Sequence, residues 1–239
     1  MSKILRTYLL LILLLLPAAL QAQVGAHRND FSIGASIGWN MNRRNFVPSI
    51  KQSYKQSPII GFTARYICEK YFTCIAGVQA EVNYNNMGWK EKIEDGSNNT
   101  YSRDLHYIEV PILMQMGWGR ELRGFKFVFM AGPQFGFLIG DEAHYGGDPW
   151  NTSNRPQHVV HQYDHAPDRK FDYGIAAGLG VEISSSIGHF IVDGRYYYGL
   201  GDGYDNSKKG YFSRSANQTI QIKLTYLFDL IKTKNCVRK

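Results

Sequence analysis

The sequence predicts an all-β fold: an eight-stranded antiparallel up-and-down transmembrane β-barrel with short periplasmic turns and long outer loops. Three observations predict it: eight segments that alternate apolar with small or polar residues, connections of alternating length, and aromatic residues at the segment ends. Of 239 residues, 14 % are aromatic, 24 are glycine and only 8 are proline, a composition typical of β structure.

The first 22 residues have the features of a secretory signal peptide. Lys3 and Arg6 precede an apolar run, Tyr8–Leu16, and a proline with small residues follows it. The run is short for a membrane span, and no later stretch of about 18 apolar residues occurs. We therefore expect a cleaved signal peptide over residues 1–22, with an uncleaved anchor as the alternative, and an exported barrel domain over residues 23–228 in the cell outer membrane.

Eight segments after the leader have the length of a tilted spanning strand, which needs about 9–11 residues. In four of them, over residues 60–66, 76–84, 173–183 and 220–228, apolar residues occupy every second position and small, polar or charged residues lie between. This pattern predicts an apolar face toward lipid and a polar face toward the lumen, whereas a soluble lipocalin-like barrel would reverse the two faces. The expected strands are, in order, Phe31–Asn40, Ile59–Cys68, Phe72–Tyr84, His106–Met116, Phe125–Leu138, Phe171–Ile183, Phe190–Leu200 and Ala216–Phe228.

The connections between these strands alternate in length without exception. An up-and-down membrane barrel explains the alternation, because its turns on the periplasmic side are short and its outer loops are long. Aromatic residues such as Trp39, Trp118 and Tyr226 stand at the strand ends, where interfacial girdles are expected. The long connections are Met41–Pro58, Asn85–Leu105, Ile139–Lys170 and Gly201–Ser215, and the short ones are Glu69–Tyr71, Gly117–Gly124 and Ser184–His189.

Charged residues on the predicted lumen face are balanced, with four acids and four bases. The lumen of an eight-stranded barrel is only wide enough for side chains, so these charges should pair and fill it. A closed lumen is therefore expected, and an ion or proton path, or a narrow porin, is the alternative. The residues of this predicted interior charge network are Arg65, Glu81, Glu109, Lys126, Glu182, Asp193, Arg195 and Lys223.

Two cysteines flank the expected turn between the second and third strands. If the hairpin is centred on Tyr71, Cys68 and Cys74 lie opposite each other on one face. The periplasm is oxidising, so a disulfide between them is predicted, with two reduced thiols as the alternative. Cys236 is then the odd cysteine, either free or paired between molecules.

The longest connection contains four of the seven histidines: His144, His158, His161 and His165. Imidazoles at this spacing could bind Zn²⁺ or Cu²⁺ if a helical turn formed, although Pro156 limits such a helix. A solvated loop without metal is the alternative. No organic cofactor is predicted.

The remaining features limit the class of function. Removing Lys3 and Arg6 with the leader lowers the net charge from +7 to +5, and no run of basic residues is longer than two, so nucleic acid is not an expected partner. No Gly-x-Ser-x-Gly or His-Glu-x-x-His motif is present, so we expect no enzyme, with a small outer-membrane enzyme as the alternative.

Basic residues in two places indicate possible partners. The first long connection contains four, which could face outer-membrane lipid and lipopolysaccharide or simply be solvated. The segment 229–239 is a basic tail, expected in the periplasm. The four basic residues of the first long connection are Arg43, Arg44, Lys51 and Lys55.

The segment Tyr101–Leu113 resembles the Y-x-R-x-L-x-Y-I-E-I-P strand of PorT-family outer-membrane β-barrel proteins. Gln79–Tyr84, Ala131–Gly136, Asp193–Tyr196 and the closing stretch 217–222 fit the same family, so the resemblance extends over most of the chain after the leader. It implies a Bacteroidetes-type outer-membrane barrel, with a role in type IX protein secretion as one expectation. Many outer-membrane barrels end on an aromatic residue, whereas here the tail follows the aromatic Phe228. Together these observations predict a membrane-embedded binding or assembly component of a cell-envelope complex.

Overall fold

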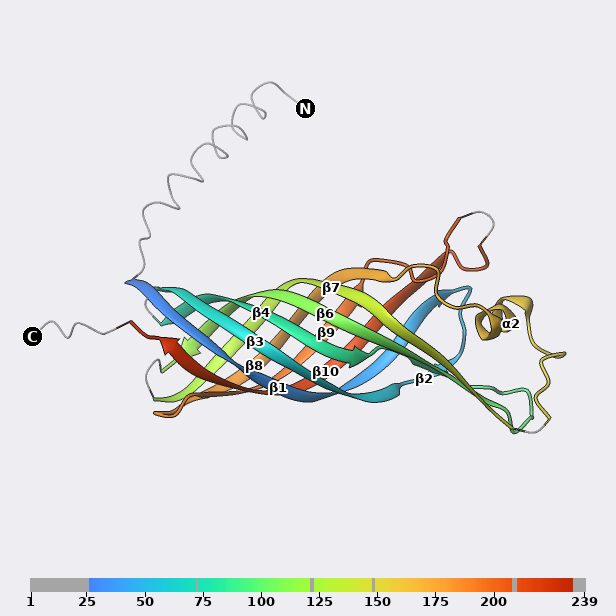
Figure 1. The fold of residues 1–239 in the computed structure, drawn as a ribbon, viewed down its shortest axis with the longest axis horizontal. Helices are drawn as coiled ribbons and strands as arrows, with labels where there is room; N and C mark the ends of the chain where they lie inside the picture. The colour runs from blue at the N-terminus through green and yellow to red at the C-terminus, as the bar shows by residue number, and fades with distance from the viewer. Residues whose placement is uncertain (1–25, 72, 121–122, 148, 208–209, 234–239) are drawn as a thin grey trace, which may run out of the picture.

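The computed structural model describes residues 26–71, 73–120, 123–147, 149–207 and 210–233, and the predicted signal peptide lies outside them. Within these residues, eight long strands form a closed ring (Figure 1). The long strands are β1 Ala26–Val47, β3 Lys55–Tyr71, β4 Cys74–Asn86, β6 Thr100–Gly119, β7 Gly124–Gly146, β8 Phe171–Ser184, β9 His189–Gly199 and β10 Arg214–Ile231. The long loops also contain β2 Gln52–Ser53, β5 Trp89–Glu91 and the helix α2 Gln157–Asp164.

Each long strand pairs antiparallel with its neighbour in the chain, and β1 pairs with β10 to close the barrel. The predicted eight-stranded up-and-down barrel is therefore confirmed. Short turns lie at one end, called here the turn end, where the chain enters β1 and leaves β10. Long loops and α2 lie at the opposite end, called here the loop end (Figure 1).

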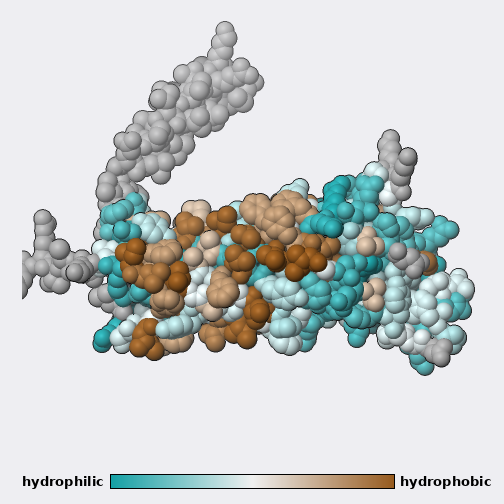
Figure 2. All heavy atoms as spheres, in the orientation of Figure 1, coloured by the Kyte–Doolittle hydropathy of each residue, from teal (hydrophilic) through white to brown (hydrophobic). Residues whose placement is uncertain are grey.

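The outward side chains form an apolar belt around the barrel. Phe62, Phe127 and Leu179 are 75 %, 69 % and 69 % exposed, as expected for side chains that lie against lipid rather than water. Figure 2 shows this belt in brown between the turn end and the middle of the molecule, with hydrophilic residues dominating the loop end. Among the described residues, no helix is long and apolar enough to cross a membrane.

The strands at the loop end are longer than the sequence predicted. The β6–β7 pair continues to Thr100 opposite Gly146, well past the expected strand limits. Apolar alternation marks only the part of a strand that meets lipid, whereas backbone pairing between β6 and β7 continues beyond it. The long loops therefore begin on a stiff two-stranded extension.

At the turn end, β10 runs to Ile231, three residues past the expected end of the last strand at Phe228. Asp229 belongs to the barrel wall, where it accepts a hydrogen bond of 2.6 Å from Ser32 Oγ and faces His189 Nε2 at 3.1 Å. These contacts hold the start of the predicted tail against the turn end. The part of the tail from residue 234, with Cys236, lies outside the described residues.

Candidate functional site

All eight charged residues of the predicted interior network are buried inside the barrel. Near the turn end, the Glu182 carboxylate lies 2.8 Å from Arg65 Nη1 and 3.0 Å from Lys126 Nζ. His189 Nδ1 lies 2.7 Å from the other oxygen of the same carboxylate. Glu182 comes from β8 and Arg65 from β3, so this cluster joins two strands that are not neighbours in the sheet.

A second cluster crosses the middle of the lumen. Register places Lys223 beside Asp193 and Gln221 beside Arg195, on β10 and β9. Across the lumen on β4, Glu81 lies 2.8 Å from Arg195 Nη1 and 2.6 Å from Lys223 Nζ. The guanidinium of Arg195 also reaches Asp193, at 2.6 Å. These contacts connect opposite walls, as the predicted pairing requires.

Glu109 is the exception to the predicted pairing. It is fully buried, and Asn85 Nδ2 donates to its Oε1 at 2.8 Å. Its Oε2 has no hydrogen-bond partner within the described residues, and no described cation forms an ion pair with it. Asn85, whose side-chain amide contacts Glu109, also has an inward position in the alternating pattern of β4. The pattern places both residues in the lumen, but it does not show which acid remains without a cation.

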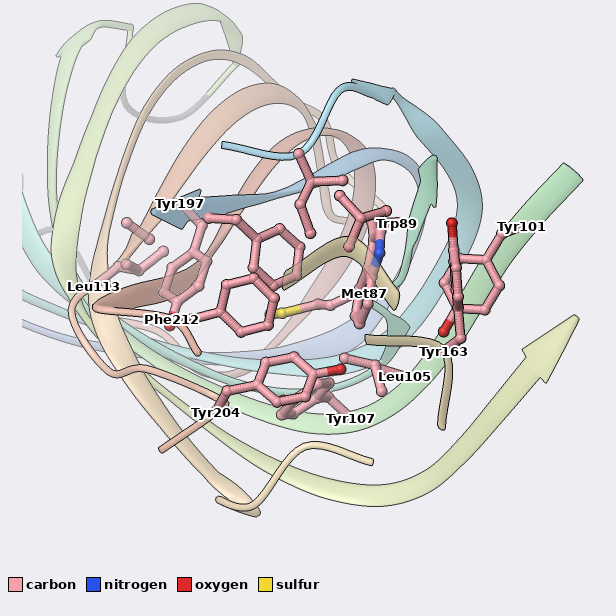
Figure 3. Close-up of a cluster of buried hydrophobic side chains, with 14 of the residues drawn as sticks. Met87, Trp89, Tyr101, Leu105, Tyr107, Leu113, Tyr163, Tyr197, Tyr204 and Phe212 are labelled. Carbon is pink, nitrogen blue, oxygen red and sulfur yellow. The ribbon is translucent and has the colours of Figure 1, made fainter. Parts of the chain in front are cut away.

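The lumen near the loop end is closed by an apolar core that the sequence analysis missed. The core lies inside the ring of strands (Figure 3) and is built from inward positions of the strand extensions together with α2 and the β9–β10 loop. Tyr101, Leu105 and Tyr107 alternate on the inward face of β6, which is the signal that could have revealed it. Its buried members are Phe46, Ile50, Met87, Trp89, Tyr101, Leu105, Tyr107, Leu113, Val128, Met130, Val159, Tyr163, Ala176, Tyr197, Tyr204 and Phe212.

Helix α2 is fixed on this core by hydrogen bonds to Gln162 and to His165, the residue that follows the helix. Trp89 Nε1 donates to Gln162 Oε1 at 2.9 Å, and Tyr101 OH donates to the Gln162 carbonyl at 2.9 Å. Arg103 Nη1 donates to the carbonyl of His165 at 2.8 Å, while its Nε donates to Asp141 at 2.6 Å. The helix therefore forms a lid that is part of the fold.

The prediction that four basic residues face lipopolysaccharide is wrong for Arg44. Arg44 alternates with the outward Arg43 on β1, so its side chain points inward and is 2 % exposed. Its guanidinium carbon lies 5.0 Å from the Trp89 ring centre and 5.6 Å from that of Tyr204.

Two further members of that set pair with acids from the next loop. Lys51 pairs with Glu94, and Lys55 pairs with Asp104. Both acids come from a neighbouring connection, so the charges within one connection do not reveal these pairs. Arg43 alone of the four remains exposed without a carboxylate partner within the described residues.

The predicted four-histidine metal site does not form. His144 lies on β7, where its Nε2 is 2.8 Å from Asp104 Oδ2, and no group of three or more metal-binding side chains occurs among the described residues. His158 and His161 lie on α2, and His165 follows it. The rings of His161 and His165 stack with their centres 4.8 Å apart. His144 pairs with Asp104 on β6, whereas His161 and His165 face rings of the β9–β10 loop, so spacing in sequence did not become proximity in space.

His161 and His165 line a groove at the loop end. The His161 ring also stacks on Tyr211 with centres 4.3 Å apart, from the β9–β10 loop. The groove consists of two adjoining hollows of about 360 and 180 Å³ that share these three side chains. We call it the loop-end groove; its further lining residues are Gln157, Val160, Asp168, Tyr204, Asp205, Gly210 and Phe212.

Two carboxylates give one side of the loop-end groove a negative charge. Burial alone would raise the pKa of Asp168, but hydrogen bonds from the Asp205 backbone N–H and from His165 lower it. Hydrogen bonds from the side chain and backbone of Ser207 lower the pKa of Asp205. Both carboxylates are therefore ionised at neutral pH, beside the stacked rings of His161, His165 and Tyr211.

The predicted disulfide is not formed, and both Cys68 and Cys74 are free. Their predicted register is wrong, because Cys74 pairs with Tyr71 and the ladder shifts between Ile67 and Glu69. Cys68 occupies this bulge, where one extra residue offsets the two strands. Sequence alternation cannot reveal a one-residue offset in a turn-proximal ladder.

Comparison with known proteins identifies the class of the barrel. The family described as outer membrane protein beta-barrel domain matches residues 21–205. Among curated proteins, none matches the chain in sequence. The PorT family itself is not tested by these matches, and that resemblance stays a prediction.

Several solved barrels are similar in fold at low identity. OprG from Pseudomonas aeruginosa is 13 % identical, with a TM-score of 0.46 over 86 % of this chain and 95 % of that one. Neisserial surface protein A is 10 % identical, with a TM-score of 0.41 over 83 % and 97 %. Ail of Yersinia pestis, in complex with the heparin analogue sucrose octasulfate, is 15 % identical, with a TM-score of 0.36 over 83 % and 99 %.

Proposed function

The chain belongs to the family of outer membrane protein beta-barrel domains, and from this premise we propose that it acts as a closed barrel that binds a protein partner through its loop end. The observation that carries the proposal is the arrangement of the loop end. One core seals the lumen and fixes α2, while the ring stack of His161, His165 and Tyr211 remains open in a groove.

The sealed lumen supports binding over transport. Ion pairs join opposite walls in the turn half and middle of the lumen, and apolar side chains fill it near the loop end. An eight-stranded barrel has no spare width beside such side chains. This filling argues against a narrow porin.

The loop end has two properties of a contact surface. It is pre-organised, because α2 is fixed by hydrogen bonds from Trp89, Tyr101 and Arg103, so little ordering is needed on binding. It also presents an exposed Tyr211 beside ionised Asp168 and Asp205. Aromatic rings next to carboxylates suit a partner segment that contains a basic side chain.

We propose that the partner belongs to a cell-envelope complex, such as the secretion apparatus that the PorT resemblance implies. No catalytic role is proposed. The basic tail offers a second contact on the periplasmic side, but its residues from 234 on lie outside the described part of the chain.

The test uses point substitutions rather than removal of the longest loop. Val159, Gln162 and Tyr163 of that loop are buried in the core, so deleting it would disrupt the lid as well as the groove. We expect Tyr211→Ala and His161→Ala to leave heat-modifiable folding intact. In vivo cross-linking should then capture a partner with the wild-type protein and lose it with these variants.

The matched control is His144→Ala, which removes an exposed histidine from β7, outside the groove lining. The control should retain the captured partner. If the groove variants and the control capture the same partners equally, the loop-end groove is not the binding surface and the proposal is wrong.

A further inference from the structure

Three neighbouring strands present a polar row directly beyond the apolar belt. On β1, β10 and β9 the belt ends with Met41 beside Ile220 and Ile220 beside Tyr196. Two residues farther along each strand, toward the loop end, Arg43 lies beside Gln218 and Gln218 beside Tyr198. Because outward side chains recur every second residue, this row is the first polar one above the lipid-facing surface.

Two arginines converge on this row. Arg43 Nε donates to Gln218 Oε1 at 2.8 Å, and its guanidinium carbon lies 5.5 Å from the Tyr54 ring centre. Arg214 lies four residues beyond Gln218 on β10, yet its Nη2 reaches back to Tyr198 OH at 3.0 Å and the Gly199 carbonyl at 3.3 Å. Its guanidinium carbon is 5.4 Å from the Tyr198 ring centre.

Neither arginine has an acidic partner in the described part of the chain, in contrast to two other arginines of the loop end. Arg103 pairs with Asp141 and Arg155 with Asp95. Arg43 and Arg214 form only neutral hydrogen bonds and ring contacts among the described residues, and Arg214 Nε is buried without a hydrogen-bond partner there. Both guanidiniums thus lie against aromatic rings, and no carboxylate among the described residues neutralises them.

We propose that the row formed by Arg43, Gln218, Tyr198 and Arg214 is a docking site for the phosphate of an outer-leaflet lipid. Neighbouring antiparallel strands hold facing residues about 5 Å apart, so Arg43 and Tyr198, one on each side of Gln218, are about 10 Å apart at the backbone. Arginine side chains span that distance from both sides, and the guanidinium fork matches phosphate oxygens. The position immediately above the aromatic end of the belt is the level of the lipid headgroup.

This site is separate from the loop-end groove and does not depend on the proposed protein binding. Lipid is also the occupant that the geometry favours over a soluble acidic ligand, because the row is continuous with the lipid-facing belt on the same three strands. In a bilayer the lipid phosphate already lies at this level, so its binding costs less translational and rotational freedom than the binding of a ligand from solution.

The experiment compares two lipids in nanodiscs of phosphatidylcholine that contain the full chain. Bis-phosphorylated lipid A or its dephosphorylated form is added, and bound lipid is counted by native mass spectrometry. Phosphorylated lipid should bind more tightly, and Arg43→Gln or Arg214→Gln should each weaken it about tenfold, the loss expected for one charge-assisted contact. The double variant should bind the two lipids equally.

The control is the double variant Arg169→Gln/Lys51→Gln, which removes the same charge from exposed loop-end positions outside the row. It should keep the preference for phosphorylated lipid. If the double variant of the row fails to fold, two measurements still test the proposal. They are the lipid binding of the single variants and the difference in binding of the two lipids to the wild-type protein. Equal binding of both lipids by the wild-type protein, or an unchanged preference in the row variants, would overturn the proposal and leave the row to an acidic protein partner.

Discussion

Replacing Glu81 by glutamine removes the carboxylate that Arg195 and Lys223 share in the middle of the lumen. The change keeps the shape of the side chain but leaves one acceptor oxygen in place of the two that now accept from Gln79 Nε2 and Asn83 Nδ2. Its main consequence is electrostatic, because two cations that cross the lumen to reach one anion lose it.

The structure indicates which cation suffers more. Arg195 keeps the Asp193 carboxylate at 2.6 Å, whereas Lys223, whose side chain is 0 % exposed, keeps a hydrogen bond of 3.1 Å to the side-chain oxygen of Asn83. Breaking a buried ion pair by removing one partner costs about 3–5 kcal/mol. We expect Glu81→Gln to lower the free energy of unfolding by about this amount.

The assay is reversible urea unfolding of the refolded protein in lipid, followed by tryptophan fluorescence and by the folded band on gels run without boiling. Adding Lys223→Met should restore most of the loss, because replacing both members of a buried pair is often close to neutral. Glu94→Gln, which removes an acid from an exposed pair with Lys51, should leave stability unchanged. A Glu81→Gln protein as stable as the Glu94→Gln control would refute the buried network.

Three further predictions test the loop end and the turn end. Trp89→Ala should cost about 3–5 kcal/mol locally, so proteases should cut the loop end while the barrel band survives. Hydrogen bonds from Ser97, then the contact with Arg155, lower the pKa of Asp95 from 3.8 to about 2, so this carboxylate stabilises the fold above its ordinary pKa and loses that contribution as the pH falls through about 2. Pepsin cleavage at the loop end should rise over this acidic window in the wild-type protein but already be high in Asp95→Asn, and an identical pH profile for both would contradict the assignment. Both Cys68 and Cys74 should be alkylated in urea without reductant, and protection of both until reduction would show that they are bridged.

The features that follow a short period in the sequence were predictable. Alternation fixed which face of each strand meets lipid, and so it placed Arg65, Glu81 and Lys223 in the lumen before any contact was known. The alternating length of the connections then determined the up-and-down order. Both signals can be found along the chain without knowing which distant residues are in contact.

The features that join distant segments were not predictable in the same way. The position of α2 depends on a hydrogen bond between Trp89 in one loop and Gln162 in another, 73 residues apart. No local sequence pattern links these two residues. Glu109 remains without a cation because the available bases meet Glu81 and Glu182 instead, a choice set by strand register across the lumen. The bulge at Cys68 likewise depends on the ladder rather than on residue type.

The most direct test of the closed, binding barrel is single-channel recording of the purified full chain in planar lipid bilayers. The buried ion pairs and the loop-end core fill the lumen from the turn end to the mouth, so we expect no stable openings across the accessible voltage range. Long-lived, large openings that recur in the wild-type protein would contradict it, because they would require an open water path where the structure places paired charges and packed rings.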